Sequence, residues 1–146
     1  MQGKKDGPLL RRRSTSPATG QGWPTMERRK RILICDDEPA LRELIRASMD
    51  DRFEFAEASD GIIAMELARE LCPDMVILDL MLPRLSGLEV LARLNADEQL
   101  RDVPVLVITA WNETREDVLA AGADDFVTKP FDPEDLRSAV NRLVAA

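Results

Sequence analysis

The sequence predicts an α/β fold in which an open, doubly wound parallel sheet of five strands is flanked by five helices. Two observations predict this fold. From Arg31 onward, short apolar runs alternate with stretches of helical periodicity, and three of these runs carry no charged residue. Continuous apolar runs are typical of central parallel strands, which helices cover on both faces. A closed barrel of about eight such units is excluded because 146 residues cannot supply them.

Five segments of the chain are strand candidates. The runs at 32–35, 75–78 and 103–108 are continuously apolar, and we expect them in the centre of the sheet. The segments 53–58 and 124–128 are weaker candidates. Short right-handed crossovers between such strands produce a parallel sheet with helices on both faces.

The helices between the strands carry start and stop signals. Pro39 suits the first turn of a helix, and a stripe on one face follows it at Leu41, Leu44, Ile45, Ser48 and Met49. Asp60 can cap a second helix, which we expect to end before Pro73. The last helix is the clearest, with Asp132 as N-cap, Pro133 in the first position, and an apolar stripe at Leu136, Ala139, Val140, Leu143 and Val144.

Residues 1–30 differ in composition from the rest of the chain. Five basic residues and one acid give Met1–Thr25 a net charge of +4, and because the whole chain carries −7, the remainder carries −11. Gly and Pro are frequent there and apolar residues are few, so we expect a disordered basic tail before a folded domain at 31–146. We interpret it as a tail without function, including a translation start at Met26. A transit peptide and a nucleic-acid-binding arm are the alternatives.

Composition excludes several classes of function. Histidine is absent, which removes Ser-His-Asp and Cys-His triads and histidine-ligated zinc sites. No apolar run approaches the length that spans a bilayer, so we expect no membrane association. Cys35 and Cys72 lie in apolar surroundings without C-x-x-C spacing, and we interpret them as buried thiols of a cytoplasmic protein.

Polar residues follow four of the predicted strands, at the edge where an open α/β sheet binds its ligands. They are Asp36 and Asp37 after the first strand, Asp79 after the third, Thr109 after the fourth and Lys129 after the fifth. Each one alone has an ordinary explanation as a turn, cap or solvated residue. Two adjacent acids are harder to explain in that way, because a helix cap needs only one of them. The convergence of acids, a hydroxyl and an ammonium indicates a site.

The residue types at this site favour phosphoryl chemistry. Oxygen ligands without sulfur or imidazole favour Mg²⁺, which typically uses only one or two carboxylates. The remaining acid can then attack phosphorus and form an acyl phosphate. Because phosphoryl transfer spreads charge over the equatorial oxygens, a metal, a lysine and a hydroxyl are the groups that stabilise it. The sequence therefore predicts a Mg²⁺-dependent phosphoryl acceptor, with Asp79 as the accepting carboxylate.

Four stretches of the sequence resemble the receiver domain of response regulators. They are I-L-I-C-D-D-E-P at 32–39, M-V-I-L-D-L-M-L-P-R-L-S-G at 75–87, V-L-V-I-T-A at 105–110 and G-A-D-D-F-V-T-K-P-F at 122–131. Together they extend the resemblance over 31–146. It implies a flavodoxin-like sheet in the order 2-1-3-4-5.

The resemblance also implies the roles of the site residues. Asp79 would be phosphorylated from a phosphohistidine on a sensor histidine kinase or a histidine phosphotransfer protein. Mg²⁺ would be held by Asp36, Asp37, Asp79 and the backbone carbonyl of Met81. The phosphoryl oxygens would be contacted by Lys129, Thr109 and Ala110.

A switch is a further implication of the resemblance. Thr109 would move toward the phosphoryl group, and Phe126 would turn inward and remodel the face from Trp111 to the C-terminus. The alternative for Phe126 is a static core aromatic. The remodelled face would bind an effector protein in trans or a second copy of the phosphorylated chain. The family also makes Lys129–Pro130 a candidate cis peptide bond.

Two other functions fit the sequence less well. Haloacid-dehalogenase-like phosphatases and phosphotransferases also form an aspartyl phosphate, but they carry a general acid two positions later, where this chain has Met81. A DNA-binding regulator needs an output domain, whereas this chain ends at Ala146, and the acidic charge opposes phosphate binding. We therefore expect a single-domain response regulator, not an enzyme acting on outside substrates and not a direct nucleic-acid binder.

Overall fold

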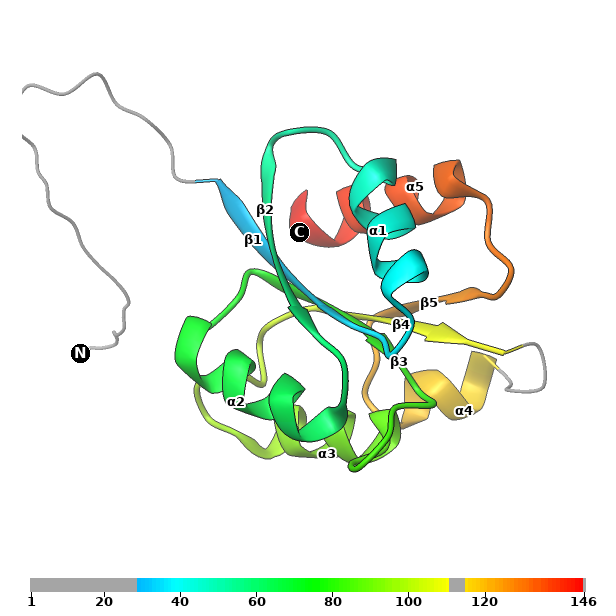
Figure 1. Ribbon diagram of the computed structural model, residues 1–146. Helices are drawn as coiled ribbons and strands as arrows, with labels where there is room; N and C mark the ends of the chain where they lie inside the picture. The colour runs from blue at the N-terminus through cyan, green and yellow to red at the C-terminus, as the bar shows by residue number, and fades with distance from the viewer. Residues whose placement is uncertain (1–28, 111–114, 146) are drawn as a thin grey trace, which may run out of the picture.

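The computed structural model describes residues 29–110 and 115–145, in which strands and helices alternate along the chain (Figure 1). The strands are β1 (Lys30–Cys35), β2 (Phe53–Ala58), β3 (Met75–Asp79), β4 (Val105–Thr109) and β5 (Asp125–Thr128). The helices are α1 (Pro39–Ser48), α2 (Gly61–Leu71), α3 (Gly87–Ala96), α4 (Arg115–Ala120) and α5 (Pro133–Ala145). The predicted tail up to residue 28 and Trp111 lie outside the described residues.

The strands form one sheet in the order β2-β1-β3-β4-β5, and every neighbouring pair is parallel. This confirms the predicted fold class and strand order. The chain winds from β1 outward to β2, then crosses β1 and continues through β3 to the other edge. Such a reversal leaves a crevice at the carboxyl ends of β1 and β3, where this class of sheet binds ligands.

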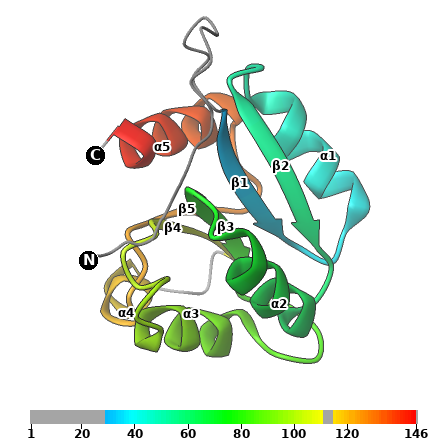
Figure 2. The same cartoon turned by 90° about the vertical axis from the view of Figure 1, so that its left-hand side faces the viewer.

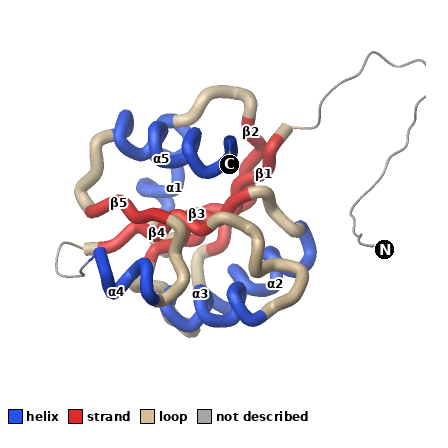
Figure 3. Tube along the Cα trace, turned by 180° about the vertical axis from the view of Figure 1, so that it is seen from behind, coloured by secondary structure: helices blue, strands red, loops and turns tan. Residues whose placement is uncertain are grey.

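Helices cover both faces of the sheet. Figures 1 and 2 show α1 and α5 on one face and α2, α3 and α4 on the other. Viewed from behind in Figure 3, the sheet runs between these two helical layers. Alternate residues of β1 serve the two layers: Ile32 and Ile34 belong to the core under α1 and α5, whereas Leu33 and Cys35 belong to the other core. Burial on both faces explains why the central strands are apolar throughout.

The predicted helix signals act as expected at three helices. Asp60 caps α2 by accepting a hydrogen bond from the backbone N–H of Ile63 at 2.9 Å. The helix ends at Cys72, which adopts a left-handed conformation before Pro73. Pro39 opens α1 and Pro133 opens α5, where a missing N–H costs no hydrogen bond.

Several expectations were wrong in detail. Leu44 was expected on the buried stripe of α1, but its side chain is 42% exposed, because the helix turns only Ile45 fully into the core. Cys72 is exposed, because it lies at the C-cap of α2 where the chain leaves the core, whereas Cys35 is buried as expected. The fourth strand begins at Val105, and β1 starts at Lys30, inside the predicted tail. No described helix is long and apolar enough to cross a membrane.

Candidate functional site

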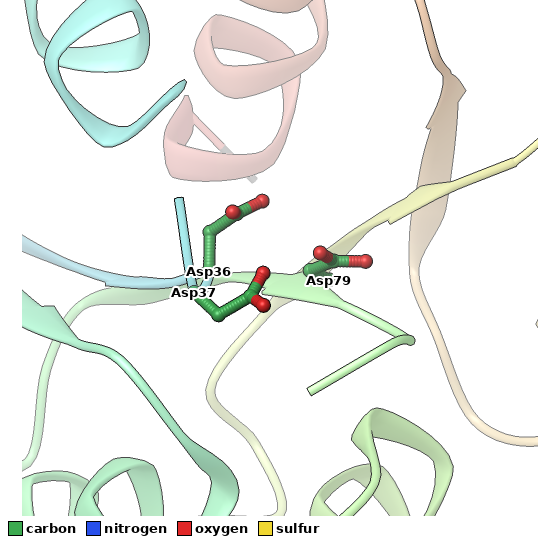
Figure 4. A group of neighbouring side chains, drawn as sticks. All are labelled: Asp36, Asp37 and Asp79. Carbon is green, nitrogen blue, oxygen red and sulfur yellow. The ribbon is translucent and has the colours of Figure 1, made fainter. Parts of the chain in front are cut away.

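The register of β1, β3 and β4 brings the predicted acids together. Cys35 lies opposite Leu78 in the sheet, so the residues that follow them, Asp36 and Asp79, are neighbours at its edge. With Asp37, they offer carboxylate oxygens that all lie within 4.8 Å of one another. Figure 4 shows these three side chains gathered at the ends of the two strands.

Asp79 is held at both of its carboxylate oxygens. The backbone N–H of Met81 donates to Oδ1 at 3.0 Å, and the ammonium of Lys129 donates to Oδ2 at 3.1 Å. The residue itself is buried. Each oxygen has a second lone pair that these bonds leave available. Asp79 is therefore oriented but still able to react or to bind a cation.

Asp36 is a buried charge with incomplete compensation. Its side chain is 0% exposed, and its Oδ1 accepts from the backbone N–H of Glu38 at 2.9 Å. Its Oδ2 lies 3.5 Å from Lys129 Nζ and has no hydrogen-bond partner among the described residues. Burial raises the pKa of Asp36 to about 6, the Glu38 N–H opposes this shift, and the negative charge of Asp79 adds to it.

Lys129 contacts both buried acids through its ammonium and is anchored to β4 through its backbone. It follows β5, and its backbone N–H donates to the carbonyl of Thr109 at 2.8 Å. Burial lowers the pKa of Lys129, but the hydrogen bond to Asp79 and the charges of Asp36 and Asp79 outweigh burial and leave the pKa raised. The peptide bond Lys129–Pro130 is cis, as the resemblance implied.

Thr109 and Phe126 are held less firmly than the acids. The Thr109 hydroxyl donates to the carbonyl of its neighbour Ala110 at 3.2 Å, and the side chain is buried. Phe126 is half-buried and packs against the core under α2, α3 and α4. The guanidinium of Arg115 lies 5.6 Å from the Phe126 ring centroid.

Met81 lies in the loop between β3 and α3, two residues after Asp79. Its side chain is 75% exposed, and its backbone N–H is the donor to Asp79 described above. The loop is closed by a hydrogen bond from the Gly87 N–H to the Leu80 carbonyl at 2.9 Å. A side chain at Gly87 would collide with the backbone carbonyl of Asp79, so glycine is needed at this approach. The role of the Met81 carbonyl as a metal ligand stays a prediction.

Sequence reasoning missed two residues beside the site. Arg42 of α1 donates through Nη1 to the backbone carbonyl of Asp36 at 2.6 Å and through Nε to Glu57 of β2 at 2.7 Å. A charged residue in a helix and another on a weak strand gave no signal in a single sequence. Their contact depends on β2 lying beside β1.

The arrangement suits a divalent cation with oxygen ligands. Three carboxylates face one small space, and Lys129 supplies one positive charge to two of them. The unpartnered Oδ2 of Asp36 is the observation that fits best, because a buried carboxylate oxygen without a donor is costly unless a cation or a proton meets it. The site could bind Mg²⁺ through Asp36, Asp37 and Asp79.

Comparison with known proteins gives one consistent family. Residues 32–141 match the family described as the response regulator receiver domain. The chain is 41% identical over 117 residues to the DNA-binding dual master transcriptional regulator RpaA of Synechocystis, covering 78% of this chain and 48% of that protein. It is 43% identical over 115 residues to the DNA-binding response regulator MtrA of Mycolicibacterium smegmatis, covering 77% and 49%. The chain thus spans about half the length of these curated relatives.

Solved structures agree with the sequence comparison. The receiver domain of AraT, a response regulator from Geobacillus stearothermophilus, matches with a TM-score of 0.71 and 34% identity, covering 80% of this chain and 93% of that chain. The receiver domain of a putative Luxo repressor protein from Vibrio parahaemolyticus matches with a TM-score of 0.75 and 27% identity, covering 80% and 91%. Sequence, fold and acid cluster agree, and the chain belongs to the response regulator receiver domain family of two-component signalling.

Proposed function

We propose that this chain accepts a phosphoryl group on Asp79 from a phosphohistidine of a partner histidine kinase or histidine phosphotransfer protein. The observation that carries the proposal is the set of contacts on one buried carboxylate: the Lys129 ammonium on Oδ2, the Met81 N–H on Oδ1, and Asp36 and Asp37 within reach of a shared cation. Phosphorylation and Mg²⁺ dependence are general features of the family. The donor histidine lies outside these 146 residues, because they contain none.

The proposed transfer breaks one bond to phosphorus and forms another. A carboxylate oxygen of Asp79 forms a bond to phosphorus as the P–N bond of the donor breaks, and the electron pair returns to the imidazole nitrogen, which takes up a proton. Lys129 holds the nucleophile before the reaction and supplies positive charge beside it. Asp36, Asp37 and Asp79, with the Met81 carbonyl as a further ligand, would hold Mg²⁺, which would supply further positive charge to the phosphoryl oxygens.

The switch is proposed to start at Thr109. Its hydroxyl donates to the carbonyl of Ala110, its own neighbour, so turning toward a phosphoryl oxygen exchanges one neutral hydrogen bond for a stronger one to an anion. Phe126 then moves further into the core that it already touches, and the α4–β5–α5 face changes shape. That face, lined by Arg115, Phe126 and residues of α5 around a cavity of about 470 Å³, binds an effector or a second copy of the chain.

The partners follow from charge and from family. The charge of −11 from Met26 onward opposes contact with nucleic-acid phosphates, so we propose that the receiver acts through protein contacts. Two relatives are named as DNA-binding regulators, but the region that aligns with this chain covers only about half of each of them. The free thiols of Cys35 and Cys72 suit a reducing compartment, and we place the protein in the cytoplasm.

One experiment tests the proposed function. The wild type, Asp79→Asn and Glu98→Gln are incubated with radiolabelled acetyl phosphate, with and without Mg²⁺. The expected label is labile to acid and alkali, needs Mg²⁺, is lost in Asp79→Asn and is retained in Glu98→Gln, whose exposed side chain lies outside the site. Label that persists in Asp79→Asn would overturn the assignment. Continuous hydrolysis of small phosphate esters would instead favour a phosphatase.

A further inference from the structure

We infer that Arg42 and Glu57 form a clamp that holds the Asp36–Asp37 turn in its metal-binding conformation, which makes Arg42 a positioning residue for Mg²⁺. The inference rests on the proposed function, because it assumes that these acids bind the metal. It concerns residues that lie outside the acid cluster and contact no phosphoryl group.

The clamp uses two donors of one planar group. Arg42 Nη1 donates to the backbone carbonyl of Asp36 at 2.6 Å, while Nε donates to Glu57 Oε1 at 2.7 Å. Glu57 lies on β2 directly opposite Ile34 of β1, so it is carried by the strand next to the one that ends in the acids. The Arg42 side chain is only 15% exposed, where charge-assisted hydrogen bonds are less weakened by water. The guanidinium thus ties α1, β2 and the end of β1 together.

The bonded carbonyl is the one that matters for the metal ligands. It belongs to the peptide unit that joins Asp36 to Asp37, so a change in the backbone dihedral on either side of that unit would move one of these side chains relative to the other. The same turn is held by the Asp36 N–H, which donates to the Ala58 carbonyl at 3.1 Å, and by the Glu38 N–H on Asp36 Oδ1. Those two contacts use N–H groups of the turn, whereas Arg42 binds the backbone carbonyl of Asp36.

The clamp opposes the electrostatic repulsion between the three carboxylates. Three carboxylates within 4.8 Å of one another push apart when no metal is bound, and the exposed Asp37 can follow that force most easily. A turn fixed in advance leaves less rearrangement to be done when Mg²⁺ arrives, which raises affinity without adding a ligand. Lysine cannot replace arginine here, because a single ammonium lacks the rigid fork that reaches both acceptors.

The chain contains a matched control for this contact. Arg46 lies one helical turn after Arg42 and forms an ion pair with the other oxygen of the same Glu57, but no described contact joins its side chain to the Asp36–Asp37 turn. Arg42→Lys and Arg46→Lys therefore make the same chemical change at the same carboxylate. They differ in whether the Asp36 carbonyl loses its donor.

The test measures the Mg²⁺ dissociation constant of each variant, from the gain in free energy of unfolding as MgCl₂ is added to metal-free protein. Arg42→Lys is expected to raise the dissociation constant about 10-fold, in the range found for residues that orient metal ligands. Arg46→Lys is expected to stay within about twofold of the wild type, because it alters only a partly exposed ion pair. Glu57→Gln, which keeps an acceptor for Arg42, is expected to lie between them and serves if Arg42→Lys does not fold.

The outcomes separate the clamp from the proposed function. If the wild type binds Mg²⁺ and Arg42→Lys binds it equally well, the clamp is wrong and the proposed function stands. If Arg42→Lys and Arg46→Lys lose affinity equally, the ion pair with Glu57 matters and the contact with Asp36 does not, which also overturns the clamp. A lower stability of metal-free Arg42→Lys with an unchanged response to Mg²⁺ identifies a purely structural role. A wild type that does not respond to Mg²⁺ overturns the metal site and the clamp together.

Discussion

The ends of β1 and β3 are held by several charged contacts, whereas the side chains on β4 and β5 are held by few. In the acidic pocket, defined as Asp36, Asp37, Asp79 and Lys129, the two buried acids accept backbone hydrogen bonds and share one ammonium. On the β4–β5 side, Thr109 donates one bond to its own neighbour, and Phe126 is half-buried beneath Arg115. The acids of the pocket are therefore fixed by more contacts than Thr109 and Phe126 are, and the proposed switch depends on this difference.

Removal of the Lys129 ammonium from the acidic pocket should have the largest effect of the changes considered, and the effect should be on the rate of phosphorylation. Lys129→Ala is expected to slow phosphorylation of Asp79 by acetyl phosphate about 100-fold, because a positioned charge next to the phosphoryl oxygens is lost. Initial rates at saturating Mg²⁺ measure this. Arg142→Ala is the control and is expected to react at the wild-type rate. It removes an exposed cation that pairs with Asp125 at the start of β5, at the opposite end of that strand from Lys129. Equal rates for Lys129→Ala and the wild type would show that Lys129 does not contribute to phosphorylation.

Neutralising Asp36 should stabilise the metal-free protein. The pKa of about 6 in the folded state lies above the ordinary aspartate value of 3.8, so the folded state binds more protons between these values and wild-type stability falls as the pH rises through this window. Asp36→Asn is expected to gain about 2 kcal/mol in free energy of unfolding at pH 7.5 in EDTA, and to lose this advantage toward pH 4. Urea unfolding at both pH values measures the difference.

The exposed neighbour provides the control for that experiment. Asp37→Asn changes the same charge in a side chain that water already solvates, so a smaller gain is expected. Added Mg²⁺ is expected to stabilise the wild type more than either variant, because each variant lacks a charged ligand. A metal-free Asp36→Asn protein that is less stable than the wild type at pH 7.5 would show that the buried acid is fully compensated.

Removal of the Thr109 hydroxyl should have a modest effect on both stability and phosphorylation. Thr109→Val keeps the volume but removes the bond to the Ala110 carbonyl, and we expect a loss of about 1 kcal/mol in free energy of unfolding. Phosphorylation is expected to slow by less than about 10-fold, because the hydroxyl supplies only one neutral donor. Thr109→Ser is the matched variant that keeps the hydroxyl. A rate loss as large as that of Lys129→Ala would place Thr109 within the pocket's main chemistry.

The contact between Arg115 and Phe126 should have the smallest effect. Arg115 is exposed and lies 5.6 Å from the ring centroid, so Arg115→Gln is expected to cost about 0.5 kcal/mol or less in free energy of unfolding. Urea unfolding measures this loss, with Arg93→Gln on α3 as a control in which another exposed arginine is removed. A cost above about 2 kcal/mol would be typical of buried contacts and would show that Phe126 is held as firmly as the acids.

Much of the fold and most of the acidic pocket could be predicted from sequence. Apolar continuity located the central strands within two residues, and capping signals located the bounds of α2 and α5. The pocket residues could be found because each lies at the end of a strand or within two residues after it, so strand ends and chemistry coincide in the chain. Leu44 and Cys72 were misplaced because periodicity predicts a face of a helix but not how far the core extends beneath it.

What the sequence by itself determined is local: strand continuity, helix caps, and which residues stand at the ends of strands. These depend on neighbours within a few positions, where backbone geometry allows few alternatives. The tertiary structure alone decided that Lys129 reaches both Asp79 and Asp36, and that Arg42 joins Glu57 to the Asp36–Asp37 turn. It also decided that Asp36 Oδ2 lacks a hydrogen-bond partner among the described residues. Those contacts join segments far apart in the chain, and they form because the order of the strands brings β2 beside β1 and β5 beside β4.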